Sequence, residues 1–226
     1  MDHVLQVGDV EMGGVARLLD GARVDAVYAD PPWNAGIATR MRQWAGDEIP
    51  VDFGFLMQAT ADAVTQALKP CGVAFLQMGV RGSGAALLEE ALAQAGLASA
   101  ARPCATIASD APAETGKWAR GAGALIIVAA RTAAEAESIE VPTDLGYTDL
   151  CRALLRQVVP PGGTVLDCFL GKGMTLRVCD AEGWSCYGME LNAKRLSEAL
   201  QRVERDRAAG RASLYEHGLS GPSEGV

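Results

Sequence analysis

The stretch VDAVYADPPWNAG, residues 24–36, carries the first group of residues that could do chemistry. A mostly apolar run, typical of a buried strand, leads directly into Asp30. Pro31 and Pro32 follow and make the backbone rigid, because each proline ring holds φ near about −65°. Trp33 then adds a large flat ring. The stretch predicts a rigid turn at a strand end that presents a carboxylate and a carbonyl oxygen as acceptors beside an aromatic face.

A second candidate group is the glycine-rich stretch TVLDCFLGKGMT, residues 164–175. A strand is predicted to end at Asp167, and a helix to begin near Met174. Gly171 and Gly173 between them let the backbone approach a ligand closely, because glycine has no Cβ. The next predicted strand ends near Glu190, and an acid at such a tip can accept both hydroxyls of a ribose. A tight strand–helix connection without a ligand would use the same glycines.

The glycine loop follows neither of the two common nucleotide-binding patterns. It is not GxGxxG, which argues against a nicotinamide or flavin cofactor, and it is not GxxxxGK[ST], which argues against a nucleoside triphosphate. The form D-x-F-x-G-x-G-x-T, followed by an acid-ended strand, resembles the S-adenosyl-L-methionine site of the amino-methyltransferases that act on exocyclic nitrogens of DNA bases. Asp-Pro-Pro-Trp, in turn, resembles the catalytic motif of the adenine-N6 members.

This resemblance implies roles for individual residues. The catalytic residues would be Asp30, Pro31, Pro32 and Trp33. The residues in contact with S-adenosyl-L-methionine would be Asp9, Asp167, Phe169, Gly171, Gly173, Thr175, Glu190 and Asn192. The loop departs from the family pattern at Cys168 and Lys172, where the family commonly has proline and serine.

The chemistry of these residue types suits methylation of an aromatic amino group. The amino nitrogen of adenine is a poor nucleophile, because its lone pair is delocalised into the ring. The Asp30 carboxylate and the Pro31 carbonyl are two acceptors for its hydrogens, and they favour a localised lone pair. The sulfonium methyl is already a strong electrophile, so transfer depends mostly on in-line positioning. Trp33 offers a face on which an extruded base can stack.

The order of the two motifs resembles the circularly permuted β group of the family, because the catalytic motif lies upstream of the cofactor loop. In that layout the strand before the catalytic one is VLQVGD, with Asp9 at its tip, and Asp9 would contact the cofactor adenine. We predict an α/β fold, a single doubly wound and mostly parallel sheet with helices on both faces. Residues 1–219 form one methyltransferase domain without a sizeable target-recognition domain, and residues 220–226 a disordered tail.

Two long loops, residues 33–54 and 108–123, are expected at strand ends and carry basic residues interleaved with tryptophan. Such groups suit nucleic acid, because cations pair with phosphates and rings stack on bases. They make the candidate nucleic-acid contacts Arg40, Arg42, Trp44, Lys117, Trp118 and Arg120; ordinary surface loops are the alternative. The family's usual recognition region has only the acidic residues 131–143 available here, so low specificity or a second subunit is a further alternative.

The remaining chain alternates predicted strands and helices, which indicates a mostly parallel sheet. Strands are expected at residues 4–7, 24–29, 72–78, 124–130, 164–169 and 186–191, with a weaker one at 105–108. Helices are expected at residues 55–68, 84–95, 145–158 and 192–208, and one beginning near residue 174.

Composition bounds the class of protein. The net charge of −8 and the pI of about 4.8 argue against a protein that coats nucleic acid by charge alone. No apolar run is long enough to span a membrane and no signal peptide is visible, so a cytoplasmic protein is expected. The six cysteines form no CxxC pair, and only two histidines accompany them, so reduced thiols and no metal site are expected.

The resulting hypothesis is an S-adenosyl-L-methionine-dependent DNA adenine-N6 methyltransferase that acts on duplex or single-stranded DNA, and the resemblance also implies that it could pair as a homodimer. An RNA adenosine-N6 methyltransferase is the second hypothesis, because the same signature marks RNA-methylating relatives. The third is a catalytically silent nucleic-acid-binding partner subunit, against which the intact motifs argue.

Overall fold

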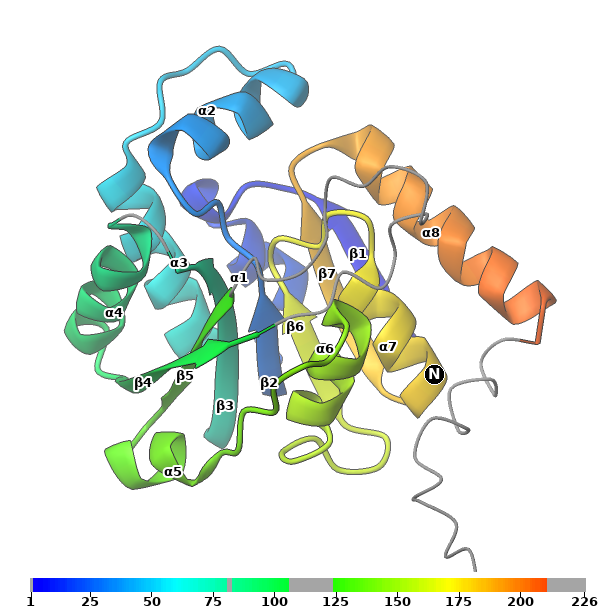
Figure 1. Ribbon diagram of the computed structural model, residues 1–226. Helices are drawn as coiled ribbons and strands as arrows, with labels where there is room; N and C mark the ends of the chain where they lie inside the picture. Colours follow the sequence, from blue (N-terminus) through cyan, green and yellow to red (C-terminus); the bar gives the residue numbers. More distant parts are fainter. Residues whose placement is uncertain (1, 81–82, 106–123, 211–226) are drawn as a thin grey trace, which may run out of the picture.

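The computed structural model describes residues 2–80, 83–105 and 124–210 of the 226-residue chain (Figure 1). Its strands are β1 (Val4–Val7), β2 (Val24–Ala29), β3 (Leu68–Gly79), β4 (Ala98–Cys104), β5 (Ala124–Ala130), β6 (Thr164–Asp167) and β7 (Ser185–Glu190). Its helices are η1 (Val10–Met12), α1 (Gly14–Leu19), α2 (Ala35–Trp44), α3 (Phe53–Ala67), α4 (Gly84–Gln94), α5 (Ala133–Ser138), α6 (Tyr147–Leu155), α7 (Met174–Glu182) and α8 (Ala193–Ala208).

The strands form one seven-stranded sheet in the order β1-β7-β6-β2-β3-β5-β4. The pairs among β1, β7, β6, β2 and β3 are parallel, and β5 pairs antiparallel with both β3 and β4. The prediction of a mostly parallel sheet is therefore confirmed. Parallel neighbours end at the same edge of a sheet. The carboxyl ends of β1, β7, β6 and β2 consequently lie side by side.

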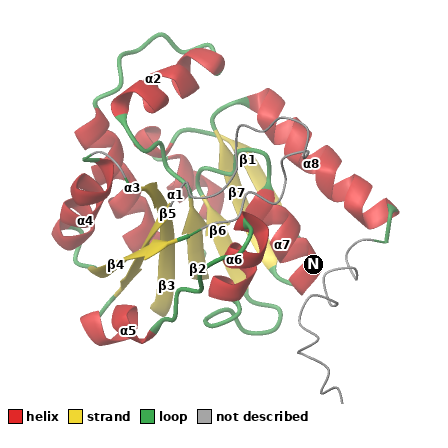
Figure 2. Cartoon of the chain, viewed as in Figure 1, coloured by secondary structure: helices red, strands yellow, loops and turns green. Residues whose placement is uncertain are grey.

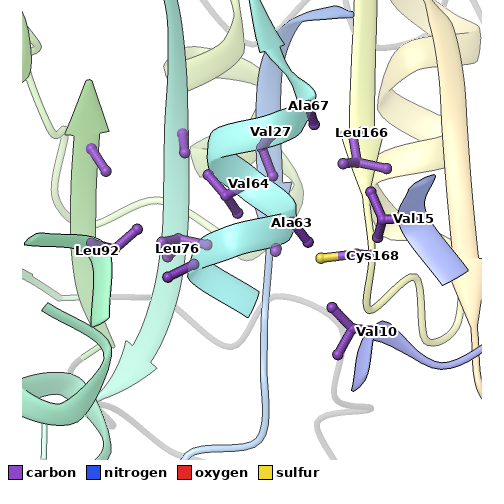
Figure 3. Close-up of a cluster of buried hydrophobic side chains, with 14 of the residues drawn as sticks. Val10, Val15, Val27, Ala63, Val64, Ala67, Leu76, Leu92, Leu166 and Cys168 are labelled. Carbon is purple, nitrogen blue, oxygen red and sulfur yellow. The ribbon is translucent and has the colours of Figure 1, made fainter. Parts of the chain in front are cut away.

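Helices cover both faces of this sheet, as the red and yellow layers of Figure 2 show. One core cluster joins α1, α3 and α4 to the sheet, and the other joins α5, α6, α7 and α8 to its opposite face. Successive residues of β2 alternate between the clusters: Val27 packs into the first, and Ala26 and Tyr28 into the second. Figure 3 shows Val27, Val64 and Leu76 in the first cluster. Burial on both faces explains why the central strands are continuously apolar.

One prediction about secondary structure is wrong. Residues 35–44, predicted to be part of a long loop, form α2, whose N-terminus is capped by the Asn34 side chain accepting the Ile37 N–H over 3.0 Å. The helix was missed because only a short apolar stripe faces the protein. Of the weak strand expected at residues 105–108, the structure describes only Ala105, which lies directly after β4 and outside any strand.

The sequence of β4, ASAARPC, gives little sign of a strand, and pairing with β5 is what organises it. It is an edge strand, where the proline at position 103 costs no central ladder bond. The expected loop at 108–123, residues 106–108 and the expected tail at 220–226 lie outside the described residues. The six cysteines form no disulfide, and five of them are buried.

Candidate active site

The glycine loop between β6 and α7 is tied to the tip of β7 through Glu190. One carboxylate oxygen of Glu190 accepts the Gly171 N–H over 2.8 Å, and the other accepts the Asn192 N–H over 2.9 Å. The Leu170 N–H also donates to the Met189 carbonyl over 2.9 Å. Each Glu190 oxygen keeps a second lone pair. The acid is thus nearly buried, oriented by two backbone donors, and still able to accept ligand hydroxyls.

Positive backbone angles explain the two loop glycines. Gly171 has φ of 55° and Gly173 has φ of 80°, a region that side chains with a Cβ rarely adopt. A Cβ on Gly173 would also come within 2.7 Å of the Ala199 Cβ in α8. The backbone angle alone therefore explains glycine at position 171, whereas the packing of the loop against α8 also requires it at position 173.

Asp167 lies behind this loop, buried at the end of β6. Its Oδ1 accepts the Phe169 N–H over 2.9 Å, and the Thr175 hydroxyl lies beside it. Burial raises the pKa of Asp167 from 3.8 to about 7, the hydrogen bond from the Phe169 N–H opposes this rise, and the charges of Asp30 and Glu190 add to it. The Asp167 carboxyl group therefore helps to set the backbone conformation of the glycine loop through its hydrogen bond to the Phe169 N–H.

Asp167→Asn is expected to make the stability of the protein less dependent on pH. Because the pKa of Asp167 is higher in the folded state than in the unfolded chain, the folded protein binds more protons between pH 4 and 7. The free energy of unfolding contributed by this group therefore falls as pH rises through that window, by on the order of 4 kcal/mol, and is constant above it. Asparagine can still accept the Phe169 N–H and does not titrate.

Thermal melts of both proteins from pH 4.5 to 8.5 measure this effect. The difference in Tm, variant minus wild type, should grow as pH rises and level off above about pH 7. Parallel melting temperatures across the range would contradict the placement of a titrating carboxyl at this position.

The catalytic-motif candidate begins where β2 ends. Asp30 is open to solvent through a pocket, while protein atoms surround it on the other sides. This enclosure raises the pKa of Asp30 to about 6, and a hydrogen bond from Trp33, whose Nε1–H lies 2.8 Å from Oδ1, opposes the rise. Pro31 and Pro32 are buried. Asp30 therefore titrates closer to neutrality than an ordinary aspartate.

A pocket joins the two groups at the carboxyl edge of the sheet. It holds about 690 Å³ of free space including its open mouth. Of the residues predicted to be catalytic or to bind the cofactor, those that line it are Asp9, Asp30, Pro32, Phe169, Gly171, Glu190 and Asn192. Five of the predicted residues lie in or directly beside the same two turns but do not line the pocket: Pro31, Trp33, Asp167, Gly173 and Thr175. β6 lies between β2 and β7, so Asp30 and Glu190 reach one pocket from either side of the glycine loop.

The prediction that Arg42 contacts nucleic acid does not fit its place in the structure. Its guanidinium lines the pocket and forms ion pairs with Asp9, with Oδ2 at 3.0 Å, with Glu11, and with Asp47 at 2.6 Å. Its side chain is only 12% exposed. Three carboxylates thus hold the charge inside the site, because an enclosed cation needs such partners. The other oxygen of Asp9 accepts the Glu11 N–H and caps η1.

Glu11 and Arg195 are pocket residues that the sequence reasoning missed. Glu11 follows Asp9 by two positions, and an acid pair after a predicted strand was the available signal. Arg195 lies in the first turn of α8, three residues after Asn192, and nothing in the sequence marked it.

The C-terminal end of α2 is fastened to the start of α8 across the pocket mouth. Asn192 donates its side-chain N–H to the Trp44 carbonyl over 2.6 Å, and the Arg195 guanidinium lies 5.1 Å from the centre of the Trp44 ring. Figure 1 shows α2 above the upper end of the sheet. Trp44 is 56% exposed and Arg40 is exposed on the same helix. Lys117, Trp118 and Arg120 lie outside the described residues.

Residues 148–201 match a family model described as DNA methylase. This segment is similar to the DNA methylase family. It runs from α6 to the first half of α8 and includes the whole glycine loop and Glu190. The family match does not include the Asp30 turn. No curated protein matches the chain.

Solved structures of methylases resemble the fold of this chain over most of its length. A DNA modification methylase from Thermus thermophilus, TTHA0409, is 21% identical with a TM-score of 0.64, covering 90% of this chain and 95% of its own. The M1.HpyAVI–SAM complex is 15% identical with a TM-score of 0.64, covering 89% and 100%. PvuII DNA methyltransferase, cytosine-N4-specific, is 15% identical with a TM-score of 0.61, covering 88% and 85%. At this identity the likeness establishes the fold.

Two further observations bear on the class of protein. None of the helices within residues 2–80, 83–105 and 124–210 is both long and apolar enough to cross a bilayer. In the same part of the chain, no three histidine, cysteine or acidic side chains are grouped in a way that could hold a metal ion.

Proposed function

We propose that the protein transfers a methyl group from S-adenosyl-L-methionine to the exocyclic N6 of adenine in DNA. The observation that carries this proposal is that Asp30 and the methylase glycine loop open into one pocket. The order of the two motifs along the chain fits the circularly permuted group of these enzymes, and one domain without a sizeable recognition module fits the described residues.

The pocket suits the proposed cofactor. Gly171 leaves the loop open to a ligand, Glu190 has acceptor capacity for two ribose hydroxyls, and Phe169 and Leu56 supply apolar walls. Four carboxylates, those of Asp9, Glu11, Asp30 and Glu190, against two guanidinium groups give the lining an acidic character that suits a cationic ligand. When bound, the cofactor supplies an electrophilic methyl group on a sulfonium.

The protein's own contribution to transfer is positioning. The Asp30 carboxylate accepts one hydrogen of the base amino group, and the Pro31 carbonyl accepts the other, so that the nitrogen lone pair is directed at the methyl group. The carboxylate must be ionised to do this, which places the acidic limb of activity near its pKa of about 6. After transfer, the surplus amino proton can leave through Asp30 to solvent at the pocket mouth.

The choice of adenine rests on the Asp-Pro-Pro-Trp turn. A pair of acceptors would also suit the N4 amino group of cytosine, which is the target named for the PvuII enzyme of the same fold. Arg40 and the exposed ring of Trp44, both on α2 at the pocket mouth, are the described residues that we assign to contact with DNA.

A direct assay tests the proposal. The protein is incubated with radiolabelled S-adenosyl-L-methionine and duplex DNA, single-stranded DNA or RNA, and the product is digested to nucleosides. Label in N6-methyldeoxyadenosine is the expected result. Label in N4-methylcytosine would overturn the adenine assignment, label in RNA alone would overturn DNA as substrate, and cofactor binding without transfer would favour a silent partner subunit.

Trp44→Ala is expected to weaken cofactor binding about two- to fivefold, because it removes the ring that Arg195 covers and loosens α2 over the pocket. The Trp44 side chain does not line the pocket, so its effect is indirect. Calorimetric titration with the cofactor measures the change. Gln43→Ala, at the exposed neighbouring position of the same helix, is the control and should bind normally. Equal affinities for the two variants would show that the contact between the Trp44 ring and Arg195 plays no part in binding.

A further inference from the structure

Two kinds of contact hold the indole of Trp33: a hydrogen bond from its N–H and close packing of its six-membered ring. Its Nε1–H donates to Asp30 Oδ1 over 2.8 Å. Its six-membered ring lies against Gly79 at the end of β3, where a Cβ would come within 2.7 Å of Cε3 and 3.0 Å of Cδ2. The Trp33 carbonyl lies directly against Gly84 at the start of α4, and a Cβ there would collide with it. The ring thus has one defined orientation.

The sheet brings these partners together. β2 and β3 are parallel neighbours, and Ala29 of β2 is in register with Leu76 of β3. The tip of β3 therefore extends past the end of β2 and forms a surface beside the Asp30 turn. A side chain at Gly79 would occupy the volume that the indole fills. Gly79 and Gly84 leave room for Trp33, and the position that they allow directs the indole N–H toward the Asp30 carboxylate.

We propose that Trp33 is a positioning residue for Asp30, and that Gly79 and Gly84 form the seat that orients its indole. The inference rests on the proposed function, because the group that Asp30 would grip is the amino group of the substrate base. The hydrogen bond occupies one carboxylate oxygen and restrains rotation of the carboxyl plane. No hydrogen bond between described residues engages Oδ2, so this oxygen stays available to the pocket.

Positioning and base stacking can be separated by chemistry. Phenylalanine keeps a flat face for a base but has no N–H. Donation from the indole stabilises the ionised carboxylate, so its loss raises the pKa of Asp30. The other ionisable groups around Asp30 are unchanged by this substitution. They are Asp9, Glu11, Arg42, Glu190 and Arg195 in the pocket, and Tyr28 and Asp167 behind it.

The first test is the pH dependence of methyl transfer at saturating cofactor. The acidic limb of the wild-type profile should have its midpoint near pH 6, and Trp33→Phe should move that midpoint upward by about one pH unit. The variant would then be most impaired below pH 7 and recover in alkaline buffer. A loss of activity by the same factor at every pH would overturn the positioning role, since loss of packing alone would not move the limb.

The second test needs no activity. The ¹⁵N–¹H resonance of the Trp33 indole, assigned by its loss in Trp33→Phe, should titrate with a midpoint near pH 6, and the titration should vanish in Asp30→Ala. An indole resonance that does not respond to pH would overturn the inference. If the wild-type protein transferred no methyl group, the proposed function would fail, and this resonance would still decide whether Trp33 holds Asp30.

Gly79→Ala tests the seat. It adds a methyl group against the ring and should reproduce the upward shift of the acidic limb, with a displaced indole resonance. In the Trp33→Phe background the same change should have little further effect, because the smaller ring no longer fills that volume. A wild-type profile for Gly79→Ala, or effects that simply add in the double variant, would overturn the seat.

Discussion

Asp30→Ala should reduce methyl transfer by about a thousandfold and leave cofactor affinity within about twofold. The substitution removes one of the two acceptors that localise the lone pair of the base amino group. Asp30 makes no described hydrogen bond to the glycine loop, so the cofactor side of the pocket is retained. Single-turnover transfer measures the first effect and calorimetric titration the second.

Asp62→Ala is the matched control for this substitution. Asp62 is an exposed acid on α3 that accepts only a surface hydrogen bond, from Gln58, so its loss changes net charge by the same amount without touching the pocket. Normal transfer is expected. If Asp30→Ala lost cofactor binding and transfer to the same degree, Asp30 would be a residue of the fold, and its assignment to catalysis would be wrong.

Glu190→Gln should weaken cofactor binding by about 2 kcal/mol, or roughly thirtyfold. The Gly171 and Asn192 N–H groups each need an acceptor, and glutamine offers one oxygen and one NH₂ group. One backbone donor would therefore face another donor, and the charge that favours ribose hydroxyls would be lost. Isothermal titration with the cofactor measures the affinity.

The control for Glu190→Gln is Glu204→Gln on the exposed surface of α8. It should bind the cofactor as the wild type does. Melting temperatures of both variants show whether the loop change also costs stability. Unchanged affinity in Glu190→Gln would contradict the assignment of the β7 tip to the ribose, whereas transfer that fell at saturating cofactor would indicate an additional role beside Asp30.

The pattern of the sequence determined the positions of the central strands and the acids at their ends. Buried parallel strands need continuous apolar runs, and such runs are visible at residues 24–29, 124–130 and 164–167. The glycines at 171 and 173 were predictable for the same kind of reason, because a turn with positive φ restricts the residue type strongly. Short or edge elements such as α2 and β4 were missed, since their apolar pattern is too brief to distinguish them from a loop.

The tertiary structure decided which of these residues share a site. Asp30 and Glu190 are far apart in the chain, and the strand order β7-β6-β2 is what places both on one pocket. Arg42 shows most clearly what the sequence could not predict. Its neighbours in sequence are typical of a surface that contacts nucleic acid, but folding places it among Asp9, Glu11 and Asp47.

The physical reason for this difference is distance along the chain: some structural features depend on neighbouring residues and others on residues far away in the sequence. Backbone angles and strand burial depend on neighbouring residues and can be read locally. The partner of a charge, or the direction of the Trp33 indole N–H, depends on side chains that the sheet order brings in from elsewhere, such as Gly79. By itself, therefore, the sequence determined the chemical groups and the turns that carry them, and only the packed sheet decided which group faces which.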